Sequence, residues 1–266
     1  MKLFVVADIH SYFSILNKTL KEKGFSLNED HILLLLGDAF DRGEEARETA
    51  ELLLSLYDRG KLIYVLGNHE ELLVKCLHQL ASGEDPYEIA TSYHAINGTW
   101  QTLVALAEMT ETEAVNNPQL LVSRVMKTRV YKELLASCVD YYETDKYIFT
   151  HGFIPCIEKG FWKGATTYSY NPDWRTAGVD EWERARWYNG MKIAVEGGIR
   201  EPEKTVVCGH WHTSIAHSKY EGKGSEWGAD ADFTPFYSEN GAVIGIDACT
   251  ATSQTVNCLV FESEDL

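Results

Sequence analysis

The sequence predicts an α/β protein with buried strands and a line of polar residues at the strand ends. Two observations support this prediction. Five short apolar runs each end abruptly in polar residues, and helical patterns separate the first three of these runs. The chain has 266 residues, of which 45% are hydrophobic and 24% charged, so it is long enough to bury a sizeable core. We expect a single domain over residues 1–266.

The five apolar runs are the predicted strands. In chain order they are LFVVA, ILLLLG, LIYVLG, YIFT and TVVCG. Continuous runs rich in valine, isoleucine, leucine and aromatic residues are typical of strands that are covered on both faces. The polar residues that follow these runs are Asp8, Asp38, Asn68, His151 and His210. Because the carboxyl ends of strands in open α/β sheets share one edge, we expect these side chains to meet there.

Helical patterns fill the connections between the first three strands. Residues 11–23 and 44–59 place leucine residues at helical spacing, and a glycine follows each stretch. From about residue 70 to 137 the chain is mainly helical in pattern, and this segment separates the third strand from the fourth. We expect it to form a helical insertion or cap beside the site.

Two later segments carry other patterns. Residues 160–200 are rich in aromatic residues and glycine without a clear period, so we expect a long loop and a short helix. Residues 241–262 contain two β-type runs joined by ATSQ, which predict a closing hairpin in a second sheet. The aromatic side chains of the first segment either form a stacking wall for a nucleobase or peptide, or pack the loop onto the core. They are Phe161, Trp162, Tyr168, Tyr170, Trp174, Trp182, Trp187 and Tyr188.

Charge and cysteine content indicate the class of protein. The net charge is −16 at pH 7 and acidic residues are spread along the chain, which disfavours binding to nucleic acid or to anionic membranes. The apolar run that begins at Leu3 is too short for a signal peptide or a membrane span. Six widely separated cysteines without a CxxC pair are typical of reduced core residues. We therefore expect a cytoplasmic protein.

The polar residues at the strand ends have the chemistry of metal ligands. Asp8 and His10 are two residues apart, so a strand that continued through them would place both side chains on one face. Carboxylate, imidazole and amide ligands without thiolate suit manganese, iron or zinc. Seven candidates exceed the needs of one ion, whereas two ions about 3.5–4 Å apart that share a carboxylate fit the number. The candidates are Asp8, His10, Asp38, Asn68, His151, His210 and His212.

The order of five motifs carries a family resemblance. DIH, GDAFDRG, GNHE, THG and GHWH closely resemble the calcineurin-like metallophosphoesterase superfamily, and they span residues 8 to 212. GDAFDRG and GNHE are similar to its phosphoprotein phosphatase branch, of the bacterial or phage type. The resemblance implies a four-layer α/β/β/α sandwich of two mixed β-sheets flanked by helices, with the helical insertion at about residues 70–137.

The resemblance also implies a reaction mechanism and a division of the ligands. It implies that two divalent cations, with manganese expected and iron or zinc as alternatives, are bridged by a hydroxide that attacks the phosphorus atom. Each cation takes its own set of side chains and one carboxylate bridges both. The sets are Asp8, His10 and His212 for the first cation, Asn68, His151 and His210 for the second, and Asp38 as the bridge.

Five further residues have roles that the resemblance implies. His69 protonates the leaving oxygen, and Asp41 orients its ring. Arg42 binds the phosphoryl oxygens. A second phosphate-binding arginine is expected near a tryptophan in EWERARWYNG, where Arg184 and Arg186 compete and Arg186 is favoured.

The resemblance implies metal-dependent hydrolysis of a phosphomonoester, with phosphoserine and phosphothreonine proteins as the first expected substrates. An alternative enzyme is a symmetrical dinucleoside tetraphosphate hydrolase or a hydrolase of small phosphodiesters, since similar bacterial enzymes share two of the motifs. A hypothesis of another class is a catalytically silent metal-binding module. Such a module would be expected to lose His69, Asp41 or a bridging ligand, and the sequence keeps all of them.

Overall fold

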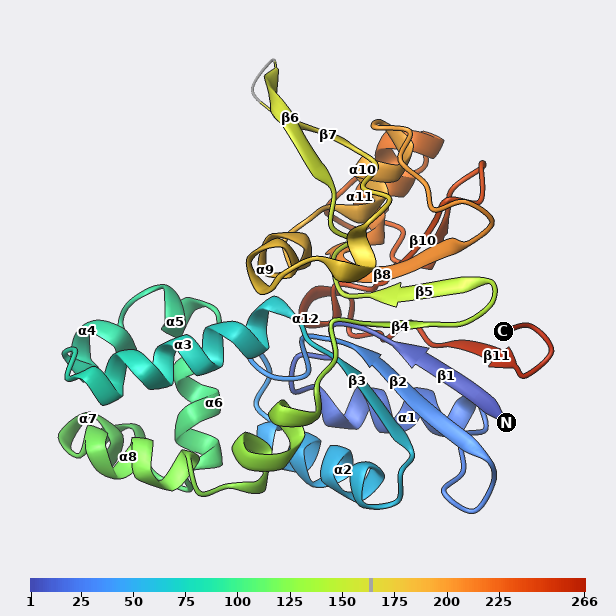
Figure 1. Cartoon of the computed structure of the whole chain (residues 1–266). Coiled ribbons are helices and arrows are strands. Elements are labelled where there is room, and N and C mark those ends of the chain that lie inside the picture. Colours follow the sequence, from blue (N-terminus) through green and yellow to red (C-terminus); the bar gives the residue numbers. More distant parts are fainter. Residues whose placement is uncertain (163–164) are drawn as a thin grey trace.

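A computed structural model of the chain describes residues 1–162 and 165–266. Two β-sheets pack face to face, and helices cover the outer face of each sheet (Figure 1). This arrangement confirms the four-layer α/β/β/α architecture that the motifs imply. In the described part of the chain, no helix has the length and apolar composition that crossing a membrane requires.

The first three apolar runs form one side of the sandwich. Their strands run parallel, and a C-terminal strand pairs antiparallel with the first, in the order β11-β1-β2-β3. Helices α1 (Phe13–Glu22) and α2 (Ala46–Asp58) connect these three strands, as predicted. The strands are β1 (Lys2–Val6), β2 (His31–Leu36), β3 (Leu62–Val65) and β11 (Leu259–Glu262).

The fourth and fifth apolar runs belong to the second sheet. Its three central strands are parallel and its two edge strands are antiparallel, in the order β4-β5-β8-β10-β9. The strands are β4 (Tyr141–Glu143), β5 (Tyr147–Thr150), β8 (Thr205–His212), β9 (Phe236–Tyr237) and β10 (Val243–Asp247).

Packing on both faces explains why the strands are apolar without alternation. In β2, Leu34 and Leu36 lie in the core between the two sheets, while Leu33 and Leu35 lie in the core under the helices. All four side chains are fully buried. Because successive side chains of a strand point to opposite faces, a strand between two apolar layers needs apolar residues at every position.

The segment predicted to be helical is helical. Its helices pack in the same hydrophobic core as the outer face of the first sheet, and Figure 1 shows them gathered to one side of α2. The helices are α3 (Asn68–Ser82), α4 (Pro86–Ala90), α5 (Tyr93–Ile96), α6 (Thr99–Leu106), α7 (Glu111–Asn116), α8 (Pro118–Val125), η1 (Val130–Leu134) and η2 (Leu135–Ser137).

The prediction of a long loop over residues 160–200 is wrong, whereas the short helix expected there is present. Two strands pair antiparallel there and form a separate two-stranded sheet, and helices follow it. A hairpin that pairs only with itself has no sheet face in a core, so its sequence lacks the alternation that marks a half-buried strand. The elements are β6 (Ile157–Trp162), β7 (Ala165–Ser169), η3 (Trp174–Thr176), α9 (Val179–Arg186) and α10 (Gly190–Val195).

The predicted C-terminal hairpin is also wrong. β10 joins the five-stranded sheet beside β8, whereas β11 joins the other sheet beside β1. A hairpin needs a short turn, but residues 248–258 separate the two strands, and this stretch includes α12 (Thr250–Ser253). The segment therefore links the two sheets. The remaining elements follow β8 and are α11 (Thr213–Ala216) and η4 (His217–Glu221).

Candidate metal centre

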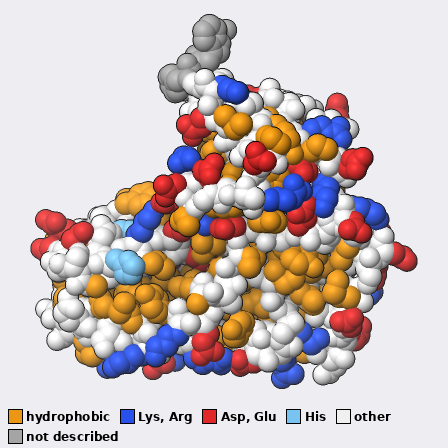
Figure 2. Space-filling model, viewed as in Figure 1, with side chains coloured by type: hydrophobic (Ala, Val, Ile, Leu, Met, Phe, Trp, Pro, Cys, Tyr) orange, Lys and Arg blue, Asp and Glu red, His pale blue; other side chains and the backbone are white. Residues whose placement is uncertain are grey.

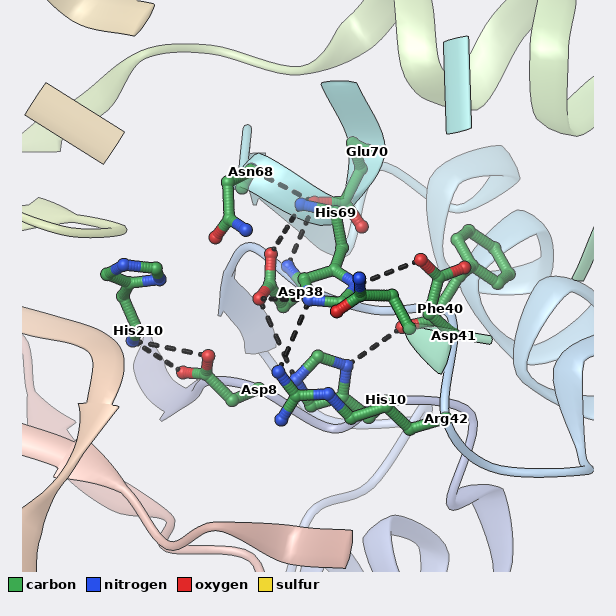
Figure 3. A network of polar contacts seen from close by, with 12 residues as sticks. Asp8, His10, Asp38, Phe40, Asp41, Arg42, Asn68, His69, Glu70 and His210 are labelled. Atoms are coloured by element: carbon green, nitrogen blue, oxygen red, sulfur yellow. Dashed lines mark hydrogen bonds and ion pairs between the residues drawn. The ribbon is translucent and has the colours of Figure 1, made fainter. Parts of the chain in front are cut away.

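Polar side chains from distant parts of the sequence meet where strands of both sheets end (Figure 3). The prediction that the ends of the apolar runs come together is therefore confirmed, although the strands belong to two sheets. Each of these residues follows a strand, lies at the end of one or begins α3. They are Asp8, His10, Asp38, Asn68, His151 and His210.

Asp38 lies at the centre of this arrangement. Its Oδ2 atom is 3.7 Å from Nε2 of His10 and 3.8 Å from Nε2 of His69, while its Oδ1 atom is 3.3 Å from Nε2 of His151. Ligand atoms of His10, Asp38 and His69 all lie within 4.8 Å of one another, and so do those of Asp38, His151 and His210. One carboxylate thus faces two groups of nitrogen ligands, which is the geometry that a bridge between two ions requires.

Two of the histidines are held in the form that binds metal. Nδ1 of His10 hydrogen-bonds the carbonyl of Phe40 at 3.0 Å, and Nδ1 of His151 hydrogen-bonds the carbonyl of Leu36 at 2.7 Å. The Nδ1 atom therefore carries the proton in each ring, and the Nε2 lone pair faces Asp38. Burial lowers the pKa of both histidines, so their rings are neutral at neutral pH, as metal binding requires.

The carboxylates at the centre make a divalent cation a good fit. Asp8, Asp38 and Asp247 are all buried. Burial raises the pKa of Asp8 well above its ordinary value, and the nearby charges of Asp247 and Asp38 raise it further. Burial likewise raises the pKa of Asp247 to about 6. Buried anions this close together are stable only with compensating positive charge, which a pair of divalent cations would provide.

The backbone around these residues is strained. Asp8, His10 and Asp38 have φ values of +52°, +45° and +54°, a region that non-glycine residues rarely occupy. Asp8 and His10 therefore lie beyond β1, and the strand geometry predicted for this pair is wrong. A Cβ atom on Gly67 would lie 2.3 Å from Oδ1 of Asp38, and one on Gly209 would lie 2.2 Å from Oδ2 of Asp8. These two positions therefore need glycine.

His69 and Asp41 form the pair that the resemblance implies. Nδ1 of His69 donates to Oδ2 of Asp41 at 2.8 Å, and Asp41 is fully buried. Burial would lower the pKa of His69, but the carboxylates of Asp38 and Asp41 outweigh this effect and raise it. Nη2 of Arg42 lies 3.3 Å from Nε2 of His69, so the guanidinium group and the proton-carrying ring are side by side.

The sequence did not identify the residues that hold Asp41. The hydroxyl of Thr99 donates to Oδ2 of Asp41 at 2.7 Å, and the hydroxyl of Thr102 donates to Oδ1 at 2.8 Å. Both threonines lie in the first turn of α6, so the helical segment reaches into the centre. Gly98 lies so close to the backbone nitrogen of Arg42 that a Cβ atom there would be 2.1 Å from it.

Glu70 was missed as well. Its carboxylate accepts hydrogen bonds from the backbone N–H groups of Asp38, Ala39 and Gly67, each at 2.9 Å, and from the hydroxyl of Tyr64 at 2.7 Å. Burial, together with the charge of Asp38, raises its pKa to about 7. Glu70 is the fourth residue of GNHE and lies in the first turn of a helix, where a glutamate can accept hydrogen bonds from backbone N–H groups. This position is the sequence signal for its role in holding the backbone.

The two arginines of EWERARWYNG have different surroundings. Arg184 is exposed and lies 3.9 Å from Glu158. Arg186 is buried, and its two terminal nitrogens are ion-paired with Glu71 and with Asp140, the latter at 2.7 Å. Arg186 therefore links α9 to α3 in this structure.

His212 lies outside both groups of ligand atoms. Its Nδ1 atom hydrogen-bonds the hydroxyl of Ser214 at 2.8 Å, and its ring packs against Trp227 with the centroids 4.3 Å apart. Asp247 is paired with His212 in the register of β10 and β8, and it contributes a carboxylate that sequence reasoning missed. The signal for Asp247 was a sixth apolar run, VIGI, that ends in a polar residue.

Most of the described part of the aromatic cluster packs into the core. Trp174 and Trp182 are buried and contact each other, with ring centroids 6.0 Å apart, whereas Trp187 is exposed. The side chains of Phe161 and Trp162 lie outside the described part of the structure.

Comparison with known proteins places these features in a family context. A family model described as calcineurin-like phosphoesterase matches residues 1–244. A stretch of 70 residues is 40% identical to serine/threonine-protein phosphatase 2 of Salmonella typhimurium, and it covers 26% of this chain and 30% of that protein. A stretch of 76 residues is 33% identical to the bis(5'-nucleosyl)-tetraphosphatase PrpE (asymmetrical) of Geobacillus sp., and it covers 26% of this chain and 31% of that protein.

The matched stretches thus span about a third of each of these relatives. Among solved structures, a candidate diadenosine tetraphosphatase is similar with a TM-score of 0.51 and 16% identity, covering 100% of this chain and 90% of that chain. At this level of identity the likeness shows the shared fold.

Proposed function

The chain belongs to the calcineurin-like phosphoesterase family, and we propose that it hydrolyses phosphoesters at the centre around Asp38. The observation that carries this proposal is the position of Asp38, whose two oxygens face two separate groups of nitrogen ligands. A site for a single ion would not need a carboxylate shared in this way.

The donor set supports a pair of divalent cations, with manganese first and iron or zinc as alternatives. Bound there, the cations would supply Lewis acidity and a water molecule of lowered pKa. Each cation would take its own ligands and share Asp38. The proposed ligands are Asp8, His10 and His212 for the first, and Asn68, His151 and His210 for the second.

Several side chains of the chain itself have proposed roles in the reaction. Asp41 accepts a hydrogen bond from Nδ1 of His69 and so keeps Nε2 facing the centre. His69 can then pass a proton from Nε2 to the departing oxygen. Arg42, whose Nη2 atom is 3.3 Å from that nitrogen, binds the oxygens of the phosphoryl group. Arg186, in preference to Arg184, stays the proposed second phosphate-binding arginine, and its ion pairs with Glu71 and Asp140 hold it in place.

We propose phosphomonoesters of serine and threonine in proteins as the first substrate class, which the likeness to the Salmonella phosphatase supports. Dinucleoside tetraphosphates are the second candidate, because a large pocket with exposed tryptophans adjoins the centre.

In Figure 2 acidic and basic side chains are interspersed on the visible face, which agrees with a substrate other than nucleic acid. The cytoplasmic location stays a prediction.

The test is a comparison of rates on four substrates with the manganese-loaded protein. They are a phosphoserine peptide, diadenosine tetraphosphate, a nucleoside monophosphate and an aryl phosphodiester. We expect turnover of at least one, and the ranking separates the two substrate classes. Protein that binds two ions but hydrolyses none of the four, nor a simple aryl phosphate, would contradict the proposed function.

A further inference from the structure

Exposed tryptophans gather at the centre. The ring centroids of Trp187 and Trp211 lie 5.6 and 6.0 Å from that of His210, and the centroid of Trp227 lies 4.3 Å from that of His212. These three rings are 41%, 38% and 53% exposed, while every other tryptophan whose side chain the structure describes is buried. Grouped apolar rings that face solvent beside a reaction centre indicate a surface that binds a ligand.

Two of these tryptophans also line a pocket of about 750 Å³. Its walls include β7, α10 and α11, which Figure 1 shows on the same side of the five-stranded sheet. Trp187 and Trp211 line this pocket and lie next to His210, so the pocket begins one ring away from the proposed metal ligands. A ligand with its phosphate at Asp38 can therefore extend into it. The volume is within the range of sites that hold small organic molecules.

The charges around the pocket do not favour a second phosphate. The lining residues include the two cations of Lys192 and Lys219 and the two anions of Glu196 and Glu226, so the charges offset one another. Glu196 also accepts a hydrogen bond from Tyr220 and is ion-paired with Lys219. A neutral planar ring that stacks on indole suits this lining better than an anionic group, and the partly exposed carboxylate of Glu226 can accept hydrogen bonds from ring amino groups.

We propose that this pocket binds the nucleobase of a nucleotide substrate, on the side of the departing group. The inference rests on the proposed function, because it places the phosphoryl group at Asp38, and it favours nucleotides over the phosphoserine and phosphothreonine proteins named first there. Water adds its oxygen to phosphorus, the bond to the 5′-oxygen of the nucleoside breaks, and that oxygen takes a proton. The base stacks on Trp187 and Trp211 throughout. Phosphoserine and phosphothreonine carry no aromatic ring on the departing oxygen, so these substrates would not fill the nucleobase pocket.

The test compares AMP with ribose 5-phosphate, which have the same departing oxygen and differ in the base. With manganese, we expect kcat/KM to be at least about tenfold higher for AMP, since stacking on one aromatic side chain is worth about that factor. Trp187→Ala should lower this ratio about tenfold, and Trp187→Phe should keep most of it. Tyr87→Ala, which removes an exposed ring on α4, is the matched control and should leave the ratio unchanged.

A ratio near one in the wild-type protein, or a ratio that Trp187→Ala does not change, would overturn the inference while the proposed function stands. A separate binding experiment does not depend on turnover or on a variant that folds. We expect adenosine to bind the wild-type protein and ribose not to bind, as measured by ligand-observed NMR. Equal behaviour of adenosine and ribose would overturn the inference even if no phosphoester is hydrolysed.

Discussion

At the scale of single residues, the centre depends on how each polar atom is held. Both oxygens of Asp38 face imidazole nitrogens, and the backbone N–H group of His69 donates to Oδ1 at 3.0 Å. Glu70 fixes the backbone of the same loop through the N–H groups of Asp38 and Ala39. The burial of these groups leaves little freedom for them to move, so the ligands are positioned before any cation binds.

His69→Asn tests the division between metal ligands and the proton donor. Positioned acid–base groups contribute about 10²–10⁴-fold to rate, so we expect kcat on an aryl phosphate to fall by about 100-fold or more. Metal content, measured by elemental analysis, should stay at the wild-type value. Loss of one metal equivalent in this variant would instead make His69 a ligand, as its place 3.8 Å from Oδ2 of Asp38 would allow.

Thr99→Val tests whether α6 positions Asp41. The variant removes a hydroxyl that donates to Oδ2 of Asp41 and leaves a buried carboxylate oxygen with one partner fewer. We expect kcat to fall about tenfold, in the range seen for groups that orient a catalytic side chain. Thr99→Ser keeps the hydroxyl and should restore most of the rate. Equal rates for the valine and serine variants would show that Thr99 does not act through Asp41.

The candidate site could be predicted from sequence only in part. Asp38 and His151 follow apolar runs, and the structure brings them together as predicted. Thr99 acts on Asp41 from 58 positions along the chain, and no local pattern marks such a pair. Asp247 had the same signal as the other strand ends, but the hairpin assigned to its segment concealed it. The roles of the ligands, including His212, stay predictions.

At the scale of elements, strands buried on both faces were the strongest signal in the sequence. β1, β2, β3, β5 and β8 were each predicted from an apolar run that ends in polar residues. Most failures involve elements without that burial pattern, and β10, which is buried throughout but was assigned to a hairpin, is the exception. β6 and β7 pair only with each other, and β11 has a partly exposed edge position in the first sheet, so their patterns did not reveal the pairing.

Leu34→Ala in β2 tests the core between the two sheets. Leu34 is fully buried there, so removing its side chain leaves a cavity and should lower the free energy of unfolding by about 2–5 kcal/mol. Val260→Ala in β11, where the side chain is partly exposed, is the control and should cost about 1 kcal/mol or less. Urea unfolding followed by circular dichroism measures both. Similar losses for the two variants would contradict the assignment of this layer as core.

At the scale of the whole molecule, charged contacts tie separate elements together. Glu143 in β4 accepts from Nε of Arg175 in η3 at 2.9 Å and from Nζ of Lys204 before β8 at 2.7 Å. The hydrogen bonds from Arg175, and then those from Lys204, lower the pKa of Glu143 from 4.5 to about 2 against the opposing effect of burial. Folding therefore favours the ionised form of this carboxyl group.

This contact predicts a dependence of stability on pH. Because the pKa of Glu143 is lower in the folded protein, its contribution is present above pH 4.5 and is lost as the pH falls towards 2. We expect Glu143→Gln to be less stable than wild type at pH 7, with a difference that shrinks below pH 4.5. Urea unfolding at several pH values measures this difference. A difference that stays constant from pH 7 to pH 3 would show that Glu143 has no lowered pKa.

The central claim is that a pair of cations binds around Asp38. Anomalous diffraction from a crystal soaked in manganese tests this claim directly. We predict two peaks about 3.5–4 Å apart with the carboxylate of Asp38 between them, one beside His10 and the other beside His151 and His210. A single peak, or no peak among these side chains in manganese-soaked crystals, would contradict it.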